Sequence, residues 1–170
     1  RYNLALQYKK EGNFFTAEDE FKRVVSLNNQ YIKGWLALGD IQSDLKNHVA
    51  AVKSYIQAVE LDPLDGYSKY QLGKEYYKLG NYSEALNSFE NAITFIKDNA
   101  WIWYNLGKVQ KKLGNPEAAG IAYNESLAID PNMLRFIESG EETDNLDILT
   151  SMVKEDPFNI DLRIKLAELK

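Results

Sequence analysis

The chain has 170 residues, of which 45% are apolar and 26% are charged, and its formal net charge is −5. These proportions are those of a folded chain about one domain long, and they exclude wholesale disorder. The negative net charge argues against a protein built to neutralise nucleic-acid phosphates. With no cysteine and a single histidine, the chain lacks the residues for a disulfide scaffold, a thiolate or His-pair metal site and a cysteine nucleophile.

Other functional classes are also without support in the sequence. No apolar run approaches the roughly 18 residues that a membrane-spanning helix needs, and the first residues do not form a signal peptide. No glycine-rich phosphate loop and no Ser/His/Asp set is present. We therefore expect no catalytic activity, no cofactor, no metal, no membrane or nucleic-acid partner, and a cytoplasmic location.

Several residue types recur at a spacing of 34 positions over four copies without a gap. Leu-Gly pairs occur at 38–39, 72–73 and 106–107, alanines at 17, 51, 85 and 119, and aromatic residues at 21, 55, 89 and 123. A fixed period of this length is the signature of stacked structural repeats, each of which buries its apolar face against the next.

This pattern resembles the tetratricopeptide repeat, which carries Trp, Leu-Gly, Tyr, Ala, an aromatic residue, Ala and Pro at set positions. Trp35 and Trp103 fill the Trp position, whereas Gln42 and Gln110 depart from the Tyr position. The resemblance covers residues 1–133. It implies an all-α, right-handed superhelical solenoid of antiparallel helix pairs, with a helix A and a helix B in each repeat.

In chain order, we expect four regular repeats at 1–31, 32–65, 66–99 and 100–133. Their helix pairs are predicted at 1–11/15–28, 32–45/49–61, 66–79/83–96 and 100–113/117–129. The mid-helix glycines Gly39, Gly73 and Gly107 are expected to let helix B approach closely, which would offset their cost of about 1 kcal/mol each in a helix.

Turn residues mark the ends of the predicted helices. Gly12, Gly80 and Gly114 are expected to end helix A in a left-handed turn. In the second copy Lys46 or Asn47 must take that conformation, unless the turn is reshaped. The prolines of Asp62-Pro63 and Asp130-Pro131 are expected to stop helix B, because the residue before a proline is disfavoured in the α region.

Beyond Pro131 the period fails, because Asp156-Pro157 follows after 26 residues instead of 34. We expect a shortened, degenerate repeat at 134–159, with a short helix at 132–138, an acidic loop at 139–144 and a helix at 145–155. Residues 160–170 form either a capping helix or the start of a further repeat. The whole is expected to be one continuous solenoid from a longer protein.

The resemblance also implies that the A helices line a concave groove. Its groove-facing positions carry eight lysines and two aspartates on 19 residues, together with six aromatic residues. The expected peptide-binding residues are Lys33, Tyr67, Tyr70, Lys74, Tyr77, Lys78, Trp101, Tyr104, Asn105, Lys108, Lys111 and Lys112. Aromatic rings supply contact area and lysines attract carboxylates, so an acidic or aromatic peptide segment is the expected partner.

A purely structural interpretation of these lysines stays open. Five of them, at 9, 10, 78, 111 and 112, lie in the last turn of a helix A, where the helix dipole favours a cation whatever binds. Only Lys33, Lys74 and Lys108 escape this explanation.

Three other candidate sites have less support in the sequence. A carboxylate clamp for chaperone C-termini has a Lys–Asn pair, an Asn and a Lys–Arg pair on three successive A helices. The corresponding positions of this chain do not carry these residues, which argues against such a partner. His48 occupies the position of Phe14 and Tyr82 in other copies and is expected to be a packing residue. The acidic residues Glu141, Glu142 and Asp144 are expected to form a solvated loop.

The sequence therefore predicts a non-catalytic scaffold or adaptor for protein–protein interaction. One alternative is a structural spacer, or a module that self-associates through the solenoid ends. Another is a regulatory arm of an enzyme whose catalytic domain lies outside this segment.

Overall fold

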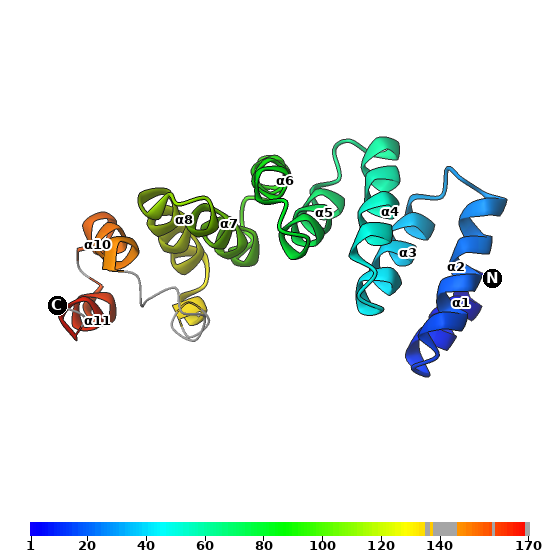
Figure 1. The fold of residues 1–170 in the computed structure, drawn as a ribbon, viewed down its shortest axis with the longest axis horizontal. Helices are drawn as coiled ribbons and strands as arrows, with labels where there is room; N and C mark the ends of the chain where they lie inside the picture. The colour runs from blue at the N-terminus through cyan, green and yellow to red at the C-terminus, as the bar shows by residue number, and fades with distance from the viewer. Residues whose placement is uncertain (135–136, 138–145, 158, 169–170) are drawn as a thin grey trace. The chain divides into compact units, whose positions relative to one another are not determined.

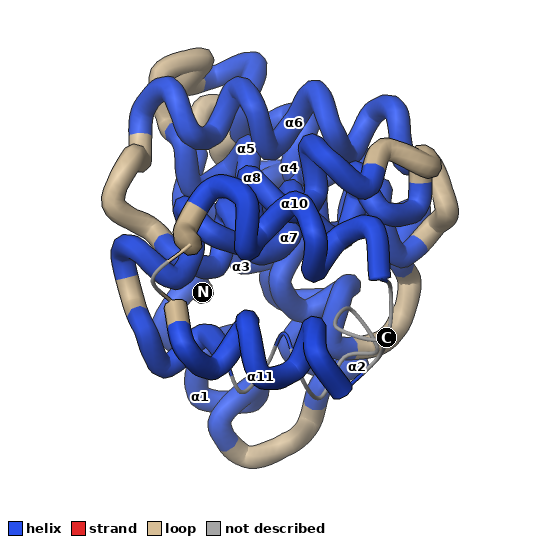
Figure 2. The backbone as a smooth tube through the Cα atoms, turned by 90° about the vertical axis from the view of Figure 1, so that its left-hand side faces the viewer, coloured by secondary structure: helices blue, strands red, loops and turns tan. Residues whose placement is uncertain are grey.

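The computed structural model describes residues 1–134, 137, 146–157 and 159–168. All regular secondary structure in these ranges is helical (Figure 2). Successive helices pack as antiparallel pairs joined by short turns, as the all-α prediction requires (Figure 1). Within the described residues, no helix is both long and apolar enough to cross a membrane. The chain divides into two compact units, 1–88 and 89–170, which are described separately.

The first unit contains five complete helices and the start of a sixth. These are α1 (Tyr2–Lys10), α2 (Phe14–Leu27), α3 (Ile32–Asp44), α4 (His48–Leu61), α5 (Gly66–Lys78) and α6 (Tyr82–Phe95), which runs across the boundary between the units. Each helix lies within about two residues of its predicted range. The core includes two clusters, one containing Phe21 and Ile41 and the other containing Tyr55 and Leu72.

The second unit begins within α6 and continues with two further regular helices and a less regular C-terminal part. Its elements are α7 (Ala100–Lys112), α8 (Pro116–Ile129), the 3₁₀ helix η1 (Pro131–Met133), α10 (Leu146–Glu155) and α11 (Ile160–Glu168). Tyr123, Met133 and Met152 are fully buried in its core, together with Leu162 of α11. The C-terminal part is therefore packed on α8 and shares its core.

The turns after the A helices have the predicted backbone conformation. Gly12, Gly80 and Gly114 have φ of 78°, 79° and 79°, and Lys46 takes the equivalent place with φ of 62°. Of the two residues considered for the second copy, Lys46 is therefore the left-handed one, while Asn47 precedes α4 and accepts a hydrogen bond from the backbone N–H of Ala50 at 3.3 Å. The turn keeps its geometry at the cost of a strained lysine.

The predicted proline stops are confirmed. Helix α4 ends at Leu61 and α8 ends at Ile129, in each case just before an Asp-Pro dipeptide. The tryptophans of the repeat also make equivalent contacts. The indole N–H of Trp35 donates to the carbonyl of Asn29 at 2.8 Å, and that of Trp103 donates to the carbonyl of Lys97 at 3.2 Å. Both bonds tie a helix A to the loop before it.

Two mid-helix glycines lie directly against a tyrosine of the paired helix B. A Cβ atom placed on Gly39 would lie 2.7 Å from Cε1 of Tyr55, and one on Gly107 would lie 2.5 Å from Cε1 of Tyr123. Both rings are fully or almost fully buried. The glycines are thus required by close packing, as the sequence pattern predicts.

The C-terminal region differs in part from expectation. The predicted helix at 132–138 begins as the 3₁₀ turn η1, which starts at Pro131 and is capped by Asp130; residues 135, 136 and 138 lie outside the described residues. The acidic loop at 139–144 also lies outside them. The predicted helix at 145–155 is α10. Helix α11 buries Leu162 and Leu166 but leaves Ile160 and Ile164 exposed by 68% and 54%, so its outer face is not purely polar.

The Gly–Tyr packing predicts whether an alanine at Gly107 raises or lowers the free energy of unfolding. Replacing Gly107 with alanine (Gly107→Ala) would stabilise an unconstrained helix by about 1 kcal/mol. Against the Tyr123 ring, the added methyl should instead lower the free energy of unfolding by about 1–3 kcal/mol. Urea denaturation of the two proteins measures the difference, and a more stable Gly107→Ala protein would contradict the close approach.

The strained lysine gives a second stability prediction. Lys46→Gly should raise the free energy of unfolding by up to about 1 kcal/mol, because glycine adopts positive φ without a Cβ clash. Asn47→Gly is the matched control: it removes the cap of α4 at a residue with φ of −85° and should destabilise the protein. Thermal unfolding of both variants tests the pair, and an unchanged or lower stability for Lys46→Gly would mean that the turn is not strained.

Candidate functional site

The first turns of α5 and α7 place the aromatic residues of the predicted site. The carboxylate of Asp65 accepts the backbone N–H groups of Tyr67 and Ser68, each at 3.1 Å, and the side chain of Asn99 accepts the N–H of Trp101 at 3.0 Å. Asp65 and Asn99 are 34 residues apart. These caps fix the start of both helices, and Tyr67 and Trp101 are exposed there by 43% and 42%.

Within the first unit, the A helices enclose an open hollow of about 210 Å³. Two residues of the predicted site, Lys33 and Tyr67, line it. The other lining residues are Tyr2, Leu6, Lys9, Phe21, Leu36, Ala37 and Asp40. Five of these, Tyr2, Leu6, Lys9, Leu36 and Asp40, are among the 19 groove-facing positions that the resemblance implies. Burial, with a contribution from Asp40, raises the pKa of Tyr67, so its hydroxyl stays protonated and able to donate.

The lysines of the site are not equally available to a ligand. Lys9 pairs with Asp44 at 2.9 Å, and Lys78 pairs with the buried Glu75 at 2.7 Å. Lys33, in contrast, is exposed and forms no ion pair with any described residue. In the hollow of the first unit, Lys33 is therefore the cation best placed to meet a carboxylate of a partner.

One arrangement of lysine and tyrosine recurs in both units. The ammonium of Lys74 lies 5.3 Å from the ring centre of Tyr70, and that of Lys108 lies 5.5 Å from the ring centre of Tyr104. Each pair spans one turn of a helix A and makes a cation–π contact. Burial is the main cause that lowers the pKa of Lys74, and the nearby Lys78 adds to it. Lys74 also donates to Oε1 of Gln71 at 2.8 Å.

Other predicted site residues take part in packing within their own unit. Tyr104 is only 8% exposed, with its ring edge-to-face against Trp101 and tilted against Tyr123, so it belongs mainly to the core of the second unit. Tyr77 is half-buried against Tyr82, with ring centres 5.5 Å apart. Asn105 donates to the carbonyl of Trp101 at 2.7 Å.

The remaining two lysines of the predicted site lie in the last turn of α7. Lys111 is half-buried and Lys112 is exposed. Their position at the C-terminus of the helix agrees with the structural interpretation of these charges, because the helix dipole favours cations there.

A buried carboxylate that the sequence reasoning missed connects three helices of the first unit. Glu75 of α5 is 1% exposed. Its Oε1 accepts from the Ser43 hydroxyl at 2.8 Å and from the Lys78 ammonium at 2.7 Å, and its Oε2 lies 2.7 Å from Nδ1 of His48. Because an ionised carboxylate can only accept, the His48 nitrogen must carry the proton. His48 is thus a hydrogen-bonding partner as well as the packing residue expected.

The sequence does hold a signal for this cluster. Glu75 occupies the position that Ile41 and Val109, both fully buried, fill in the neighbouring repeats. A glutamate in an aliphatic position of a repeat predicts a buried charge, which requires partners. The partners themselves come from α3, α4 and α5, and their meeting could be seen only in three dimensions.

The cluster is suited to holding helices together more than to chemistry. Ser43 donates to the carboxylate of Glu75 and not to the imidazole, so the hydroxyl–imidazole contact of a serine nucleophile is not formed here. Among the residues that the structure describes, no group of three metal-ligating side chains lies close enough to hold a metal ion.

The Glu75 cluster makes stability depend on pH. Burial acts to raise the pKa of Glu75, but the hydrogen bonds from Lys78, Ser43 and His48 outweigh it and leave the pKa below its usual value. A carboxyl whose pKa is lower in the folded state stabilises the fold above its unfolded pKa, and this contribution disappears as the pH falls through the folded pKa.

Glu75→Gln should therefore lower the free energy of unfolding at neutral pH by about 2 kcal/mol, because an amide keeps neither the charge nor all three acceptor contacts. The loss should shrink as the pH falls below about 4.5, the ordinary pKa that the carboxyl has in the unfolded chain, and should be smallest once the pH lies below the lower pKa of the folded state. Urea titrations at several pH values measure it. Glu60→Gln, an exposed change on α4, is the control, and equal effects of the two changes would rule out the proposed linkage.

Comparison with known families agrees with this architecture. Profiles described as "TPR repeat" and "Tetratricopeptide repeat" match residues 73–114 in the first case, and residues 32–63 and 100–133 in the second. No curated protein sequence matches the chain significantly.

Solved structures with the same fold include several of MamA. One crystal structure of MamA has a TM-score of 0.80 and 20% sequence identity, and the alignment covers 97% of this chain and 91% of that one. The structure of a MamA RS-1 double mutant has a TM-score of 0.79 at 18% identity, covering 98% and 90%. A structure of MamA MSR-1 has a TM-score of 0.70 at 20% identity, covering 76% and 74%. At these identities the likeness concerns the fold alone.

Tetratricopeptide repeats generally mediate protein–protein interactions, and their fold is typically non-catalytic. The 34-residue period, the Gly–Tyr packing of paired helices and the three profile matches agree with one another. The chain is a tetratricopeptide-repeat protein.

Proposed function

We propose that the chain is a scaffold that binds an acidic or aromatic segment of a partner protein on the faces of its A helices. The observation that carries the proposal is the hollow of the first unit, where aromatic rings and an unpaired lysine lie side by side. In this unit we assign the contact with the partner to Lys33 and Tyr67. Lys74, whose ammonium lies over the ring of Tyr70, adds a second cation.

The chemistry of the hollow suits such a segment. Tyr2 and Tyr67 offer ring surface, and Leu6 and Leu36 add apolar area for a side chain of the partner. Lys33 supplies the cation for a partner carboxylate. Asp40 also lines the hollow, but its Oδ1 accepts from the Tyr55 hydroxyl at 2.6 Å, which ties this carboxylate to the core.

The second unit carries a comparable face on α7. Trp101 is 42% exposed, and Lys108 lies two helical turns after it, with its ammonium over the ring of Tyr104. Because Tyr104 is largely buried, we assign the contact on this unit to Trp101, Lys108 and the exposed Lys112. Aromatic anchors next to cations are typical of binding surfaces.

Binding of a short synthetic peptide in which glutamate alternates with phenylalanine tests the proposal by fluorescence anisotropy. Lys33→Glu should weaken binding about tenfold, because it replaces an attraction by a repulsion at the mouth of the hollow. The same charge reversal at Lys108 should weaken binding if the second unit also takes part. At Lys74, which is half-buried, Lys74→Gln is the safer change.

Lys53→Glu is the matched control. Lys53 is an exposed lysine on helix α4, and its replacement changes the net charge by the same amount as Lys33→Glu. Affinity capture of partners with the wild-type chain and with a Lys74→Gln/Lys108→Glu variant then identifies proteins that depend on these lysines. If Lys33→Glu and Lys53→Glu reduce peptide binding equally, the peptide senses only net charge and the hollow is not its site.

A further inference from the structure

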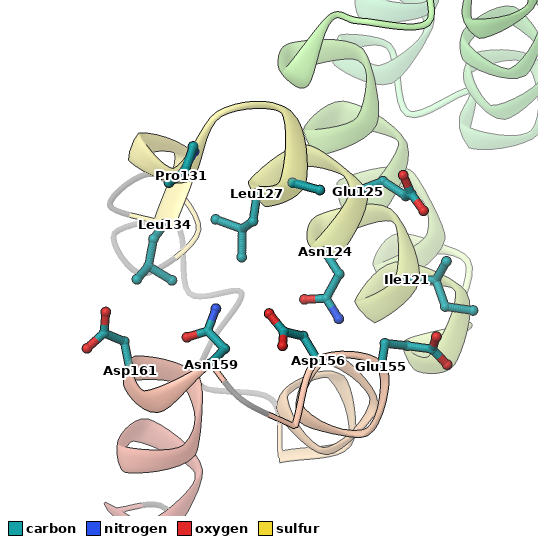
Figure 3. A pocket seen from close by; sticks show the side chains of 11 residues that line it. Ile121, Asn124, Glu125, Leu127, Pro131, Leu134, Glu155, Asp156, Asn159 and Asp161 are labelled. Atoms are coloured by element: carbon teal, nitrogen blue, oxygen red, sulfur yellow. The ribbon is translucent and has the colours of Figure 1, made fainter.

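The second unit contains a larger groove that lies away from the predicted site. Its volume is about 520 Å³, and it is enclosed by α8, by η1 with the residue after it, and by the junction between α10 and α11 (Figure 3). None of the twelve residues of the predicted peptide-binding site lines it. We call it the α8–α11 groove.

The groove is strongly acidic. Glu125 comes from α8, Glu155 and Asp156 come from the end of α10, and Asp161 comes from the start of α11. No lysine or arginine is among the lining residues, and none of these four carboxylates forms an ion pair with a described residue. All four residues are exposed. Asp161 also borders a neighbouring hollow that contains Lys165, so the argument depends mainly on the other three.

Apolar side chains form the rest of the surface. Figure 3 places Leu127 over the middle of the groove, Leu134 at the end near Asp161, and Ile121 at the other end near Glu155. Ile121 is 42% exposed although it is a large apolar residue in the middle of a helix. A mixed surface of this kind fits a ligand that carries both a cation and an apolar group.

The groove also contains an unsatisfied acceptor. Asn124 donates through Nδ2 to the carbonyl of Met152 at 2.7 Å, which ties α8 to α10. Its Oδ1 is buried and has no hydrogen-bond partner among the described residues. In Figure 3, Asn124, Asp156 and Asn159 point toward one another across the groove. A buried acceptor without a partner costs about 1–3 kcal/mol, so an N–H donor entering here would be favoured.

The interrupted repeat accounts for the groove. In the regular repeats helix A follows helix B, whereas after α8 the chain starts with the 3₁₀ turn η1, and the next Asp-Pro pair comes eight residues earlier than the period predicts. Helix α10 instead packs closely on α8, where a Cβ atom on Gly120 would lie 2.7 Å from that of Ser151. The exposed Ile121 and Glu125 lie beyond this contact and line the groove.

We infer that the α8–α11 groove binds a basic segment of a partner protein. A lysine or arginine of the segment lies among Glu125, Glu155 and Asp156, and a neighbouring aliphatic side chain contacts Ile121 and Leu127. The occupant is opposite in charge to the acidic segment proposed for the A-helix faces. The two sites are separate, so either one can exist without the other.

The test uses the whole chain and a short fluorescent peptide in which arginine alternates with leucine. The peptide should bind at low ionic strength, and the Glu125→Lys/Glu155→Lys variant should weaken binding at least about tenfold. Ile121→Ser should weaken it by about three- to tenfold, since Ile121 is exposed and its replacement should leave the fold intact.

Glu90→Lys is the matched control, because Glu90 is an exposed glutamate on α6 in the same unit. Circular dichroism spectra establish that each variant is folded. An acidic counterpart of the peptide, with glutamate in place of arginine, should not respond to changes in the groove. Equal losses for Glu90→Lys and for the groove variant, or no loss with Ile121→Ser, would overturn the proposal.

Light scattering distinguishes binding of a partner segment from self-association of the chain through the groove. If another copy of the chain occupies the groove, the wild-type protein should form an oligomer that Glu125→Lys/Glu155→Lys dissociates. That result would replace the partner segment by self-association. A protein that stays monomeric while binding the arginine peptide in the groove supports the proposal. Lys33→Glu, which tests the hollow of the first unit, should leave binding of this peptide unchanged.

Discussion

The structure depends on the short distance between the two helices of a pair. Gly39 and Gly107 leave the backbone of helix A bare at the point where Tyr55 and Tyr123 lie against it, and the space there admits no methyl group. With the helices this close, the tyrosine rings are excluded from water and become centres of the core. The same packing fixes which side of each helix A stays outside, and therefore which lysines and aromatic residues can meet a partner.

Most of the fold could be predicted because the constraint repeats. Glycines at positive φ recur with the period and the prolines after helix B recur two periods apart. Even the exception in the second copy could be narrowed to Lys46 or Asn47, since the turn needs one left-handed residue whatever its type. The end of the chain was harder to predict. Once the period fails after Pro131, the number of residues no longer fixes where an element packs: η1 depends on tertiary contacts with α8, and α11 on contacts with α10.

The candidate site was less predictable than the fold. Position in the repeat indicates which residues face outward, but it does not show which of the lysines form ion pairs with carboxylates of the same chain. Lys78 is engaged by a buried glutamate and Lys9 by Asp44, whereas Lys33 forms no ion pair with a described residue. Tyr104 occupies a groove position yet serves mainly as a core residue. Counting lysines on one face therefore overstates the positive charge that a partner meets, because ion pairs form between helices that the linear pattern treats separately.

The Glu75 cluster has a consequence for the modularity of the chain. Repeats of this kind are usually regarded as interchangeable, because each contacts its neighbours through the same apolar positions. Here the third copy contributes Glu75 and Lys78, and the second contributes Ser43 and His48. Duplicating or transplanting the third copy alone would place a charged carboxylate against a neighbour without these donors. The second and third copies are thus a matched pair, and this part of the chain can have diverged only by coordinated change on both sides of their junction.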